Sequence, residues 1–366
     1  MSHFLKDILR QPQELQQTVR HLSGAGRGAL EAAVAVLQTA RHVYLSGIGS
    51  SWHAGLNVAA LFQLGARPVY LVDAAELVQF AAIPAGAVLI VISRSGRSVE
   101  IVQLLRKARD SGATVIGITN AADGALAREA QIPIVIPIAL DHAISVNTYT
   151  TLALAAGVLA GAVTASVDLT GSTGKSAGAT GLLADSLSPA FAAAGQAIPA
   201  WQDQIEKSEW LAPRCTTYFL ARGTSLGSAY EARLMWEEGV KSPATAMGAA
   251  SFRHGPQEIV QKDMRFGIWI DGTKMREQDL ALALDLRKLG ARVMLIGQRL
   301  PAGAGDLVFQ LPEIASEWQF LIDIIPAQLV AERLARMSGA DPDTFRLCSF
   351  VVEDEAGLLP ADKTKR

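Results

Sequence analysis

A serine-rich loop lies between an apolar segment typical of a strand and a segment with a helical pattern. Residues 92–98 (ISRSGRS) follow the apolar run 88–91 and precede the helical pattern at residues 99–105. The first N–H groups of a helix lack partners within it and lie at the positive end of the helix dipole, which favours an anion. A serine there can also simply cap the helix, but capping needs only one. The loop therefore predicts a site for a phosphate-bearing ligand.

The segments that must position this loop occur in two copies. Gly49-Ser50-Ser51 matches Gly223-Thr224-Ser225 at an offset of 174 residues, and Pro68 matches Pro243 at an offset of 175. Residues 112–115 match residues 290–293 at an offset of 178. Such a nearly constant offset indicates an internal repeat. Apolar strands that alternate with helices predict two doubly wound α/β units, each binding ligand beyond the carboxyl ends of its parallel strands.

The expected elements and domains follow from these patterns. Strands are expected at residues 43–45, 69–72, 88–92, 115–118 and 134–136 in the first copy, and at 218–220, 266–270, 293–296 and 308–311 in the second. The expected domains are an N-terminal helical segment (1–39), a first domain (40–165), a helical linker (166–205), a second domain (206–340) and a C-terminal tail (341–366).

Composition narrows the class of protein. Half of the 366 residues are hydrophobic, which is typical of well-buried domains and excludes a disordered chain. A net charge of −2 without a basic arm argues against nucleic acid as a partner. Two cysteines and no apolar signal segment at the N-terminus predict a cytoplasmic protein. The apolar run 152–163 is too short to span a membrane and predicts a buried helix.

Four stretches together resemble the sugar isomerase (SIS) domain family, in the tandem arrangement of the isomerase half of glucosamine-6-phosphate synthase and of related deglycases. They are residues 47–55 (GIGSSWHAG), the serine loop at 93–98, residues 230–238 (YEARLMWEE) and residues 252–256 (FRHGP). The resemblance covers roughly residues 40–350 and implies two tandem flavodoxin-like domains. No cysteine follows Met1 and no glutaminase domain precedes the repeat, so we do not expect glutamine-dependent amino transfer.

The resemblance implies that the two loops of the first copy bind a sugar phosphate. Its phosphate-binding positions are Gly49, Ser50, Ser51, Ser93, Arg94, Ser95, Gly96 and Ser98. Arg97 stands where related enzymes often carry an acidic residue. The matching loop of the second copy, residues 270–275 (IDGTKM), lacks the serines and contains an acid. We therefore expect one phosphate to bind per chain.

The resemblance also implies a catalytic pair, Glu238 and His254. A carboxylate placed over C1 and C2 of a sugar can move a proton between them through an enediol, and an imidazole can assist ring opening near neutral pH. In the family this histidine reaches the site of the neighbouring subunit, which implies a homodimer. Taken without the motif, Glu238 is typical of a solvated helix face, and His254 of a turn before Pro256.

Other residues are assigned less directly. Glu231, two helical turns before Glu238, is expected to contact sugar hydroxyls or to hold the loop, and Ser145 and Thr148 to touch substrate. His53 is expected to pack or cap a helix. No His, Cys and Asp cluster has metal-ligand spacing, so neither a metal nor another cofactor is expected.

Two positions depart from the synthase. Cys348 stands where its C-terminal loop carries a lysine, and Met235 where another lysine lies near the substrate. Cys348 is expected to be a buried apolar side chain or a weak acid, the former being favoured, and Lys363 and Lys365 are possible substitutes. The losses argue against the synthase's own reaction and leave open other enediol chemistry.

Three functions remain. The first is an isomerase of a hexose or amino-sugar 6-phosphate. The second is a deglycase or deaminase that cleaves the C–N bond of a 6-phosphorylated sugar–amine adduct, which needs the same acid and base but no ring-opening lysine. The third, a non-catalytic sugar-phosphate sensor, is disfavoured because both proposed catalytic residues are present.

Overall fold

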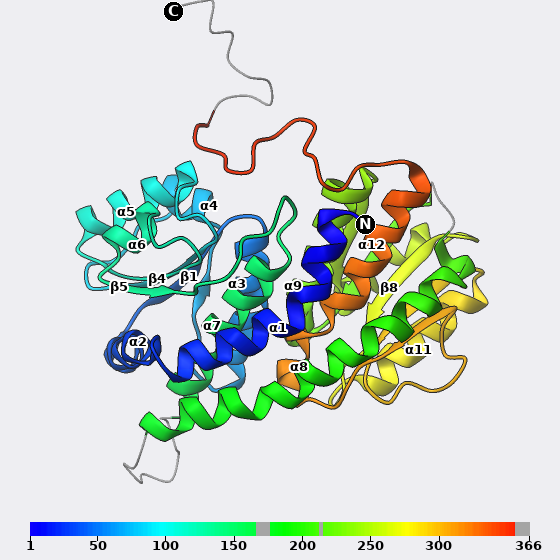
Figure 1. Ribbon diagram of the computed structural model, residues 1–366, viewed down its shortest axis with the longest axis horizontal. Coiled ribbons are helices and arrows are strands. Elements are labelled where there is room, and N and C mark those ends of the chain that lie inside the picture. The colour runs from blue at the N-terminus through cyan, green and yellow to red at the C-terminus, as the bar shows by residue number, and fades with distance from the viewer. Residues whose placement is uncertain (166–175, 212–214, 356–366) are drawn as a thin grey trace, which may run out of the picture.

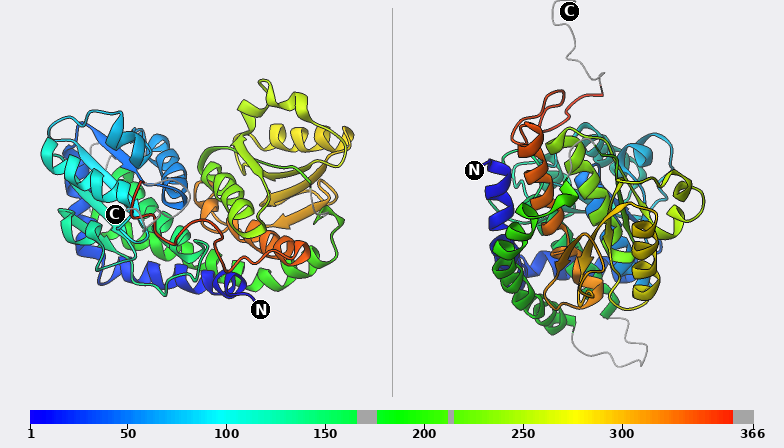
Figure 2. Two further views of the ribbon diagram at one scale, coloured as in Figure 1. Left: turned by 90° about the horizontal axis from the view of Figure 1, so that it is seen from above. Right: turned by 90° about the vertical axis from the view of Figure 1, so that its right-hand side faces the viewer.

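The chain folds into two α/β lobes that lie side by side (Figure 2). The structure is a computed structural model that describes residues 1–165, 176–211 and 215–355. These residues form two parallel five-stranded sheets, with the strand orders β2-β1-β3-β4-β5 and β10-β9-β8-β6-β7. Both orders are the 2-1-3-4-5 arrangement of the flavodoxin-like doubly wound fold, which confirms the predicted fold class.

The first lobe contains the first sheet and its covering helices. Its strands are β1 (Val43–Ser46), β2 (Tyr70–Leu71), β3 (Val88–Ser93), β4 (Thr114–Thr119) and β5 (Ile132–Val135). Its helices are α2 (Arg27–Thr39), α3 (Ser50–Leu64), α4 (Ala74–Gln79), α5 (Val99–Ser111), α6 (Ala125–Glu129) and α7 (Asn147–Ala165). The apolar run 152–163 lies in α7 and is almost wholly buried, as expected.

The second lobe repeats this topology. Its strands are β6 (Thr217–Ala221), β7 (Ala244–Gly248), β8 (Arg265–Trp269), β9 (Arg292–Gly297) and β10 (Leu307–Gln310). Its helices are α9 (Leu226–Met235), α10 (Ala249–Phe252), α11 (Arg276–Lys288) and α12 (Ile324–Ser338). Gly49 and Gly223, matched by the sequence offset, both have a positive φ, 56° and 54°. Gly112 and Gly290 also match, with φ values of 70° and 87°.

Strand β7 is absent from the sequence-based expectation. Its residues, ATAMG, include one large apolar side chain and no β-branched residue except threonine. Such a segment carries almost no strand signal of its own. It becomes a strand because it lies at the sheet edge, where β6 supplies parallel partners from Thr217 to Ala221.

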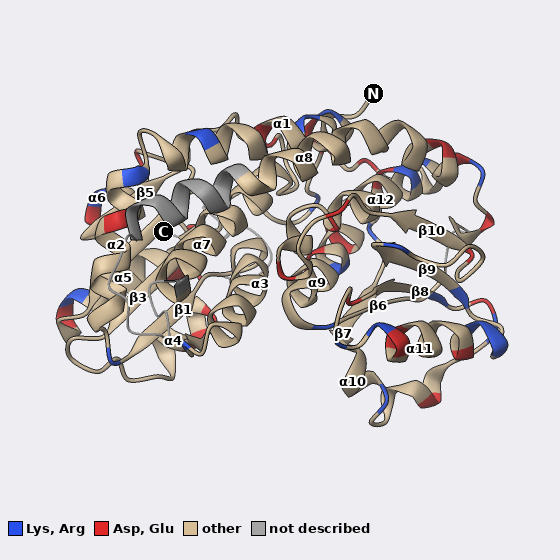
Figure 3. Ribbon diagram, turned by 90° about the horizontal axis from the view of Figure 1, so that it is seen from below, with Lys and Arg blue, Asp and Glu red and all other residues tan. Residues whose placement is uncertain are grey.

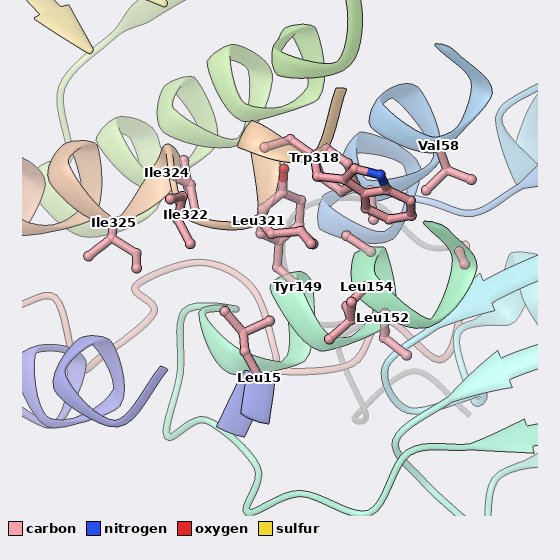
Figure 4. Packing of buried hydrophobic residues seen from close by; sticks show 14 of the residues in the cluster. Leu15, Val58, Tyr149, Leu152, Leu154, Trp318, Leu321, Ile322, Ile324 and Ile325 are labelled. Atoms are coloured by element: carbon pink, nitrogen blue, oxygen red, sulfur yellow. The ribbon is translucent and has the colours of Figure 1, made fainter. Parts of the chain in front are cut away.

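One hydrophobic core joins the inner faces of both sheets. Successive side chains of β3 point to opposite faces: Val88, Ile90 and Ile92 enter the shared core, while Leu89 and Val91 pack under α4 and α5. Figure 4 shows side chains from α1 (His3–Ser23), α3, α7 and the 3₁₀ segment Ser316–Leu321 meeting in this core, with Tyr149 and Trp318 among them. The lobes are therefore parts of one packed body.

Two long helices, α1 and α8 (Ser176–Glu206), pack against helices of both lobes. Helix α8 packs on α1, α7 and α12, and in Figure 1 it runs from below the first lobe across the second. The predicted leading and linking helices are thus present as α1, α2 and α8. None of the helices in the described residues is both long and apolar enough to cross a membrane.

Helices α3 and α9 approach each other closely where the lobes meet. A Cβ built on Gly227, in the first turn of α9, would lie 2.1 Å from Asn57 Oδ1 and 2.2 Å from the backbone oxygen of His53, both in α3. Real Cβ atoms essentially never come this near, so the crossing requires glycine.

We expect Gly227→Ala to lower the free energy of unfolding by about 1–2 kcal/mol, because overpacking at a helix crossing outweighs the gain of about 1 kcal/mol in helix propensity. Gly28→Ala is the matched control, since Gly28 lies exposed in α2 with nothing within 4 Å of its added Cβ. It should raise the same quantity by up to about 1 kcal/mol. Urea denaturation measures both, and an unchanged or more stable Gly227→Ala variant would contradict the close crossing.

Candidate functional site

The serine loop lies at the carboxyl end of β3 and leads into α5. Ser93 Oγ accepts the N–H of Gly96 at 3.1 Å, and Ser95 Oγ accepts the N–H of Arg97 at 3.2 Å. These two serines therefore shape the loop. Ser98 is the N-cap residue of α5, yet its hydroxyl makes no capping hydrogen bond. Capping does not explain this hydroxyl.

The two loop residues Gly96 and Arg97 have structural partners. Gly96 has φ 61°, and a Cβ there would lie 2.8 Å from Leu126 Cβ, so only glycine fits. The Arg97 guanidinium forms an ion pair with Asp123. Arg97 is therefore not directed at the serines, and the positive charge near them comes from Arg94.

A cavity of about 250 Å³ lies between this loop, the Gly49-Ser50-Ser51 turn and the second lobe. Ten of the residues predicted from sequence line it. They are Gly49, Ser50, Ser51, Ser93, Arg94, Ser95, Ser98, Ser145, Glu238 and Cys348. Three others, Gly96, Glu231 and His254, are not among its lining residues. The structure thus places the carboxyl group of Glu238 and the serine loop on one cavity.

Glu238 lies in a single π-helical turn, Trp236–Val240, that continues α9. The sequence predicted an uninterrupted helix here, and π-turns are frequent at functional sites. Burial, and after it the nearby charge of Glu231, raises the pKa of the Glu238 carboxyl to about 8 against the opposing effect of Arg94 and Lys241. Glu238 is therefore a much stronger base, once ionised, than an exposed carboxylate.

Glu231 has a structural position rather than a place in the cavity. It is fully buried in α9, and its two carboxylate oxygens accept from Ser50 Oγ at 2.9 Å and contact His53 Nδ1 at 2.7 Å. Both partners belong to α3 of the other lobe. Of the two expected roles, holding the loop is the one that the geometry supports, and His53 packs within the structure as expected.

His254 lies on an exposed turn between α10 and the 3₁₀ segment Pro256–Ile259. Figure 3 shows α10 at the end of the second lobe that is remote from α1 and α8. Within one chain, His254 is not among the residues that line the cavity with Glu238. Its assignment to a neighbouring subunit's site stays a prediction.

Asp141 organises the start of α7. Its carboxylate accepts from the backbone N–H of Val146 and Thr148 and from Thr148 Oγ1, at 2.9, 2.8 and 2.7 Å. Thr148 is consequently buried and committed to this cap, contrary to the expectation that it touches substrate. Ser145 does line the cavity. His142 stacks on His3, with ring centroids 4.1 Å apart.

The C-terminal segment covers the cavity. Arg94 donates to the backbone oxygens of Ala143 and Phe350 at 3.2 and 2.7 Å, and the first N–H of α5, from Val99, donates to Val352 at 3.0 Å. Cys348 lines the cavity as an exposed free thiol, so the expectation that it is buried was wrong. Lys363 and Lys365 lie outside the described residues.

Lys241 is a site residue that the sequence did not reveal. Its amino group donates to the backbone oxygen of Glu238 and, at 2.9 Å, to that of Thr344, and it lies 5.8 Å from the Phe345 ring centroid. Burial lowers its pKa. Lysines are common after helices, and the lysines of the family motif stand elsewhere, so no local signal marked it.

A neighbouring cavity of about 350 Å³ shares Glu238, Phe345 and Cys348 with the first. Lys241 and Arg346 contribute positive charge to it. Glu238 therefore lines both the serine-lined cavity and this neighbouring one, to which Glu237 contributes a further carboxylate. Among the described residues, no three His, Cys, Asp or Glu side chains converge in a way that would hold a metal ion.

Comparisons with known proteins agree with this architecture. Residues 36–160 match the SIS domain family. The chain is 26% identical over 354 residues to an isomerising glutamine–fructose-6-phosphate aminotransferase of Pyrobaculum aerophilum, and 28% identical over 358 residues to that of Aeropyrum pernix. Each match covers 94% of this chain and 56% of the relative. The chain thus spans just over half the length of these relatives.

Solved structures show the same fold. The C-terminal domain of glucosamine-fructose-6-phosphate aminotransferase from Francisella tularensis superposes with a TM-score of 0.81 at 21% identity, covering 93% of this chain and 97% of that one. Glucosamine-6-phosphate deaminase from Thermotoga maritima gives a TM-score of 0.75 at 21% identity, covering 96% and 99%. The chain therefore contains an SIS domain and is homologous to the isomerase domain of the isomerising aminotransferases.

Proposed function

We propose that the chain is an SIS-family enzyme that isomerises a hexose or amino-sugar 6-phosphate. The observation that carries the proposal is the shared cavity, which joins the Glu238 carboxyl to the serine loop and Arg94. The fructose-6-phosphate and glucosamine-6-phosphate in the names of similar proteins support a phosphorylated hexose or hexosamine. The site's hydroxyls and its arginine are suited to such a phosphate.

The front lobe would hold the phosphate. The hydroxyls of Ser51 and Ser98 and the guanidinium of Arg94 face the cavity, where they can donate to phosphate oxygens. Arg94 makes its hydrogen bonds to neutral backbone carbonyls, and the acidic residues Glu100 and Glu238 line the same cavity. A phosphate held here would fix the distance from the sugar carbons to the second lobe.

The back lobe would supply the base. An ionised Glu238 placed over C1 and C2 takes the proton from one carbon and returns it to the other through an enediol or enediolamine intermediate. Its raised pKa strengthens it as a base, since proton abstraction from carbon requires one of high basicity. His254 of a partner subunit is proposed to assist ring opening, so the active unit would be a homodimer.

A deglycase or deaminase is the second candidate, and the cavity beyond Glu238 favours it. A sugar phosphate alone would occupy the 250 Å³ cavity, whereas an amino-acid adduct would extend past Glu238. There Lys241 and Arg346 can bind its carboxylate. The same proton transfers at Glu238 would convert the adduct to an imine, and water would then hydrolyse the imine to a sugar phosphate with a free carbonyl group and the released amine.

Glu238→Gln tests the proposed base. We expect kcat to fall by about 10²–10⁴-fold because the amide cannot accept the proton. Binding of the sugar phosphate, measured by titration calorimetry, should change little. Glu277→Gln is the matched control, since it makes the same change on an exposed side chain of α11 that lines neither cavity. If Glu238→Gln turns over as fast as the wild type, Glu238 is not the base.

The pKa of Glu238 predicts the pH dependence. Because the carboxyl must lose its proton first, kcat/KM should rise about tenfold per pH unit below pH 8 and level off above it. The free energy of unfolding should change in the opposite direction and fall as the pH rises. The raised pKa contributes stability that is complete below the ordinary value of 4.5 and is lost as the pH rises through about 8.

Steady-state rates and urea denaturation across pH 4–10 measure the two trends. This range includes both the ordinary pKa of 4.5 and the raised pKa of about 8. Glu237→Gln should move the rising limb of kcat/KM to lower pH, because Glu237 raises the pKa of Glu238. A rising limb that stays in place in this variant would show that another group titrates.

Products distinguish the two candidate functions. Hexose 6-phosphates, amino-sugar 6-phosphates and glycated amino acid 6-phosphates are each incubated with the protein and followed by mass spectrometry. We expect a mass-neutral conversion from the isomerase, whereas release of ammonia or an amino acid identifies the lyase. In the latter case, Arg346→Gln should raise KM about tenfold for carboxylate-bearing adducts only. Equal effects on substrates without that carboxylate would exclude the proposed role of the second cavity.

A further inference from the structure

The second lobe contains a larger cavity that the proposed reaction does not use. Its volume is about 730 Å³, within the range of about 300–1,000 Å³ typical of small-molecule sites. Loops after β6 and β8 form one side of it. The ends of α3 and α7, from the first lobe, form another. A ligand bound here would contact both lobes.

The cavity's place in the sheet is one that favours ligands. Strands β6 and β8 are neighbours at the point where the strand order of the second sheet reverses. In open α/β sheets, ligands bind outside the carboxyl ends of the strands at this switch point. The serine-lined cavity occupies the corresponding position beyond β1 and β3 of the first sheet.

The turn after β8 is closed to a phosphate. Asp271 Oδ2 accepts the backbone N–H groups of Lys274 and Met275, each at 2.7 Å, just before α11 begins. A carboxylate oxygen thus takes the donors that an anion would use, and its charge repels another anion. The first lobe has serine hydroxyls in its corresponding loop.

The walls are suited to a flat, uncharged molecule. Leu61, Leu64, Trp269 and Trp318 contribute apolar surface. Trp318 stacks on Phe320, with ring centroids 6.1 Å apart, so its indole is held in place.

Polar groups at the same cavity are mostly neutral. The hydroxyls of Thr224, Thr273 and Ser316 line it. Arg222 also lines it, but its Nε donates to Asp279 at 2.7 Å. This cation is therefore paired with a carboxylate of the protein. The other charged residues of the lining are one cation, Lys274, and two acids, Asp271 and Glu317.

We propose that this cavity binds an uncharged organic molecule with a flat ring and hydroxyl groups, of the nucleoside or aryl-glycoside class. The ring lies against the leucines and tryptophans, and its hydroxyls bond to the threonine and serine side chains. The site is separate from the serine-lined cavity and does not depend on the reaction proposed there.

Titration calorimetry with adenosine, uridine and phenyl β-D-glucoside tests the proposal, and AMP and UMP serve as charged counterparts. We expect at least one uncharged probe to bind one per chain with a Kd below about 1 mM. Its phosphorylated counterpart should bind this cavity at least about tenfold more weakly. The absence of binding by all three uncharged probes at about 5 mM would overturn the proposal.

Two variants locate the binding. Thr273→Trp places an indole from an exposed turn residue into the cavity and should abolish binding of the uncharged probe. Thr39→Trp, at the exposed end of α2, is the matched control and should leave it intact. Circular dichroism checks that both variants fold. Binding that persists in Thr273→Trp would also overturn the proposal.

Asp271→Ser tests the reason for the excluded charge. It removes the carboxylate that holds the N–H groups of Lys274 and Met275, so AMP should gain at least about tenfold in affinity at this cavity while the uncharged probe changes little. The double variant with Thr273→Trp should lose that gain. An AMP affinity that Asp271→Ser leaves unchanged would contradict the assignment of the ligand's charge.

Discussion

The buried contact of Glu231 with Ser50 and His53 is the interaction on which the site depends. It joins α9 of the second lobe to α3 of the first, beside the close crossing at Gly227. A carboxylate buried this deeply is stable only with hydrogen-bonding partners, and loss of a partner typically costs about 3–5 kcal/mol. The contact therefore sets how the turn that carries Glu238 lies against the serine-lined lobe.

The same contact couples the architecture to the proposed chemistry. Glu231 raises the pKa of Glu238 from its buried position, and Arg94 lowers it from the serine loop. The protonation of Glu238 thus depends on groups from both lobes and on its own burial. A bound phosphate would weaken the effect of Arg94, which makes the base stronger when substrate is present.

The two lobes have one topology but differently lined cavities. Both sheets have the same strand order and a cavity at the same switch point. The difference lies in a few loop residues: serine hydroxyls shape the turn after β3, and Asp271 fills the turn after β8. The turn after β3 leaves room for an anion, whereas the turn after β8 already contains the carboxylate of Asp271.

Local patterns in the sequence determined much of the fold. The apolar runs that became β3, β4, β8 and β9, and the glycines of the two matching turns, have strong short-range signals, so their types and places could be predicted. The serine loop was predicted from its residue types, and Glu238 from the resemblance to the SIS family. That both line one cavity follows from the packing of the two lobes.

Only the tertiary structure decided the rest. Strand β7 exists because β6 pairs with it, and Lys241 joins the site because the C-terminal segment folds back to Thr344. The exposure of Cys348, the burial of Glu231 and the larger cavity depend on contacts between residues far apart in the chain. A sequence records which side chains are present, but burial and pairing arise from packing, and packing sets their charge and reactivity.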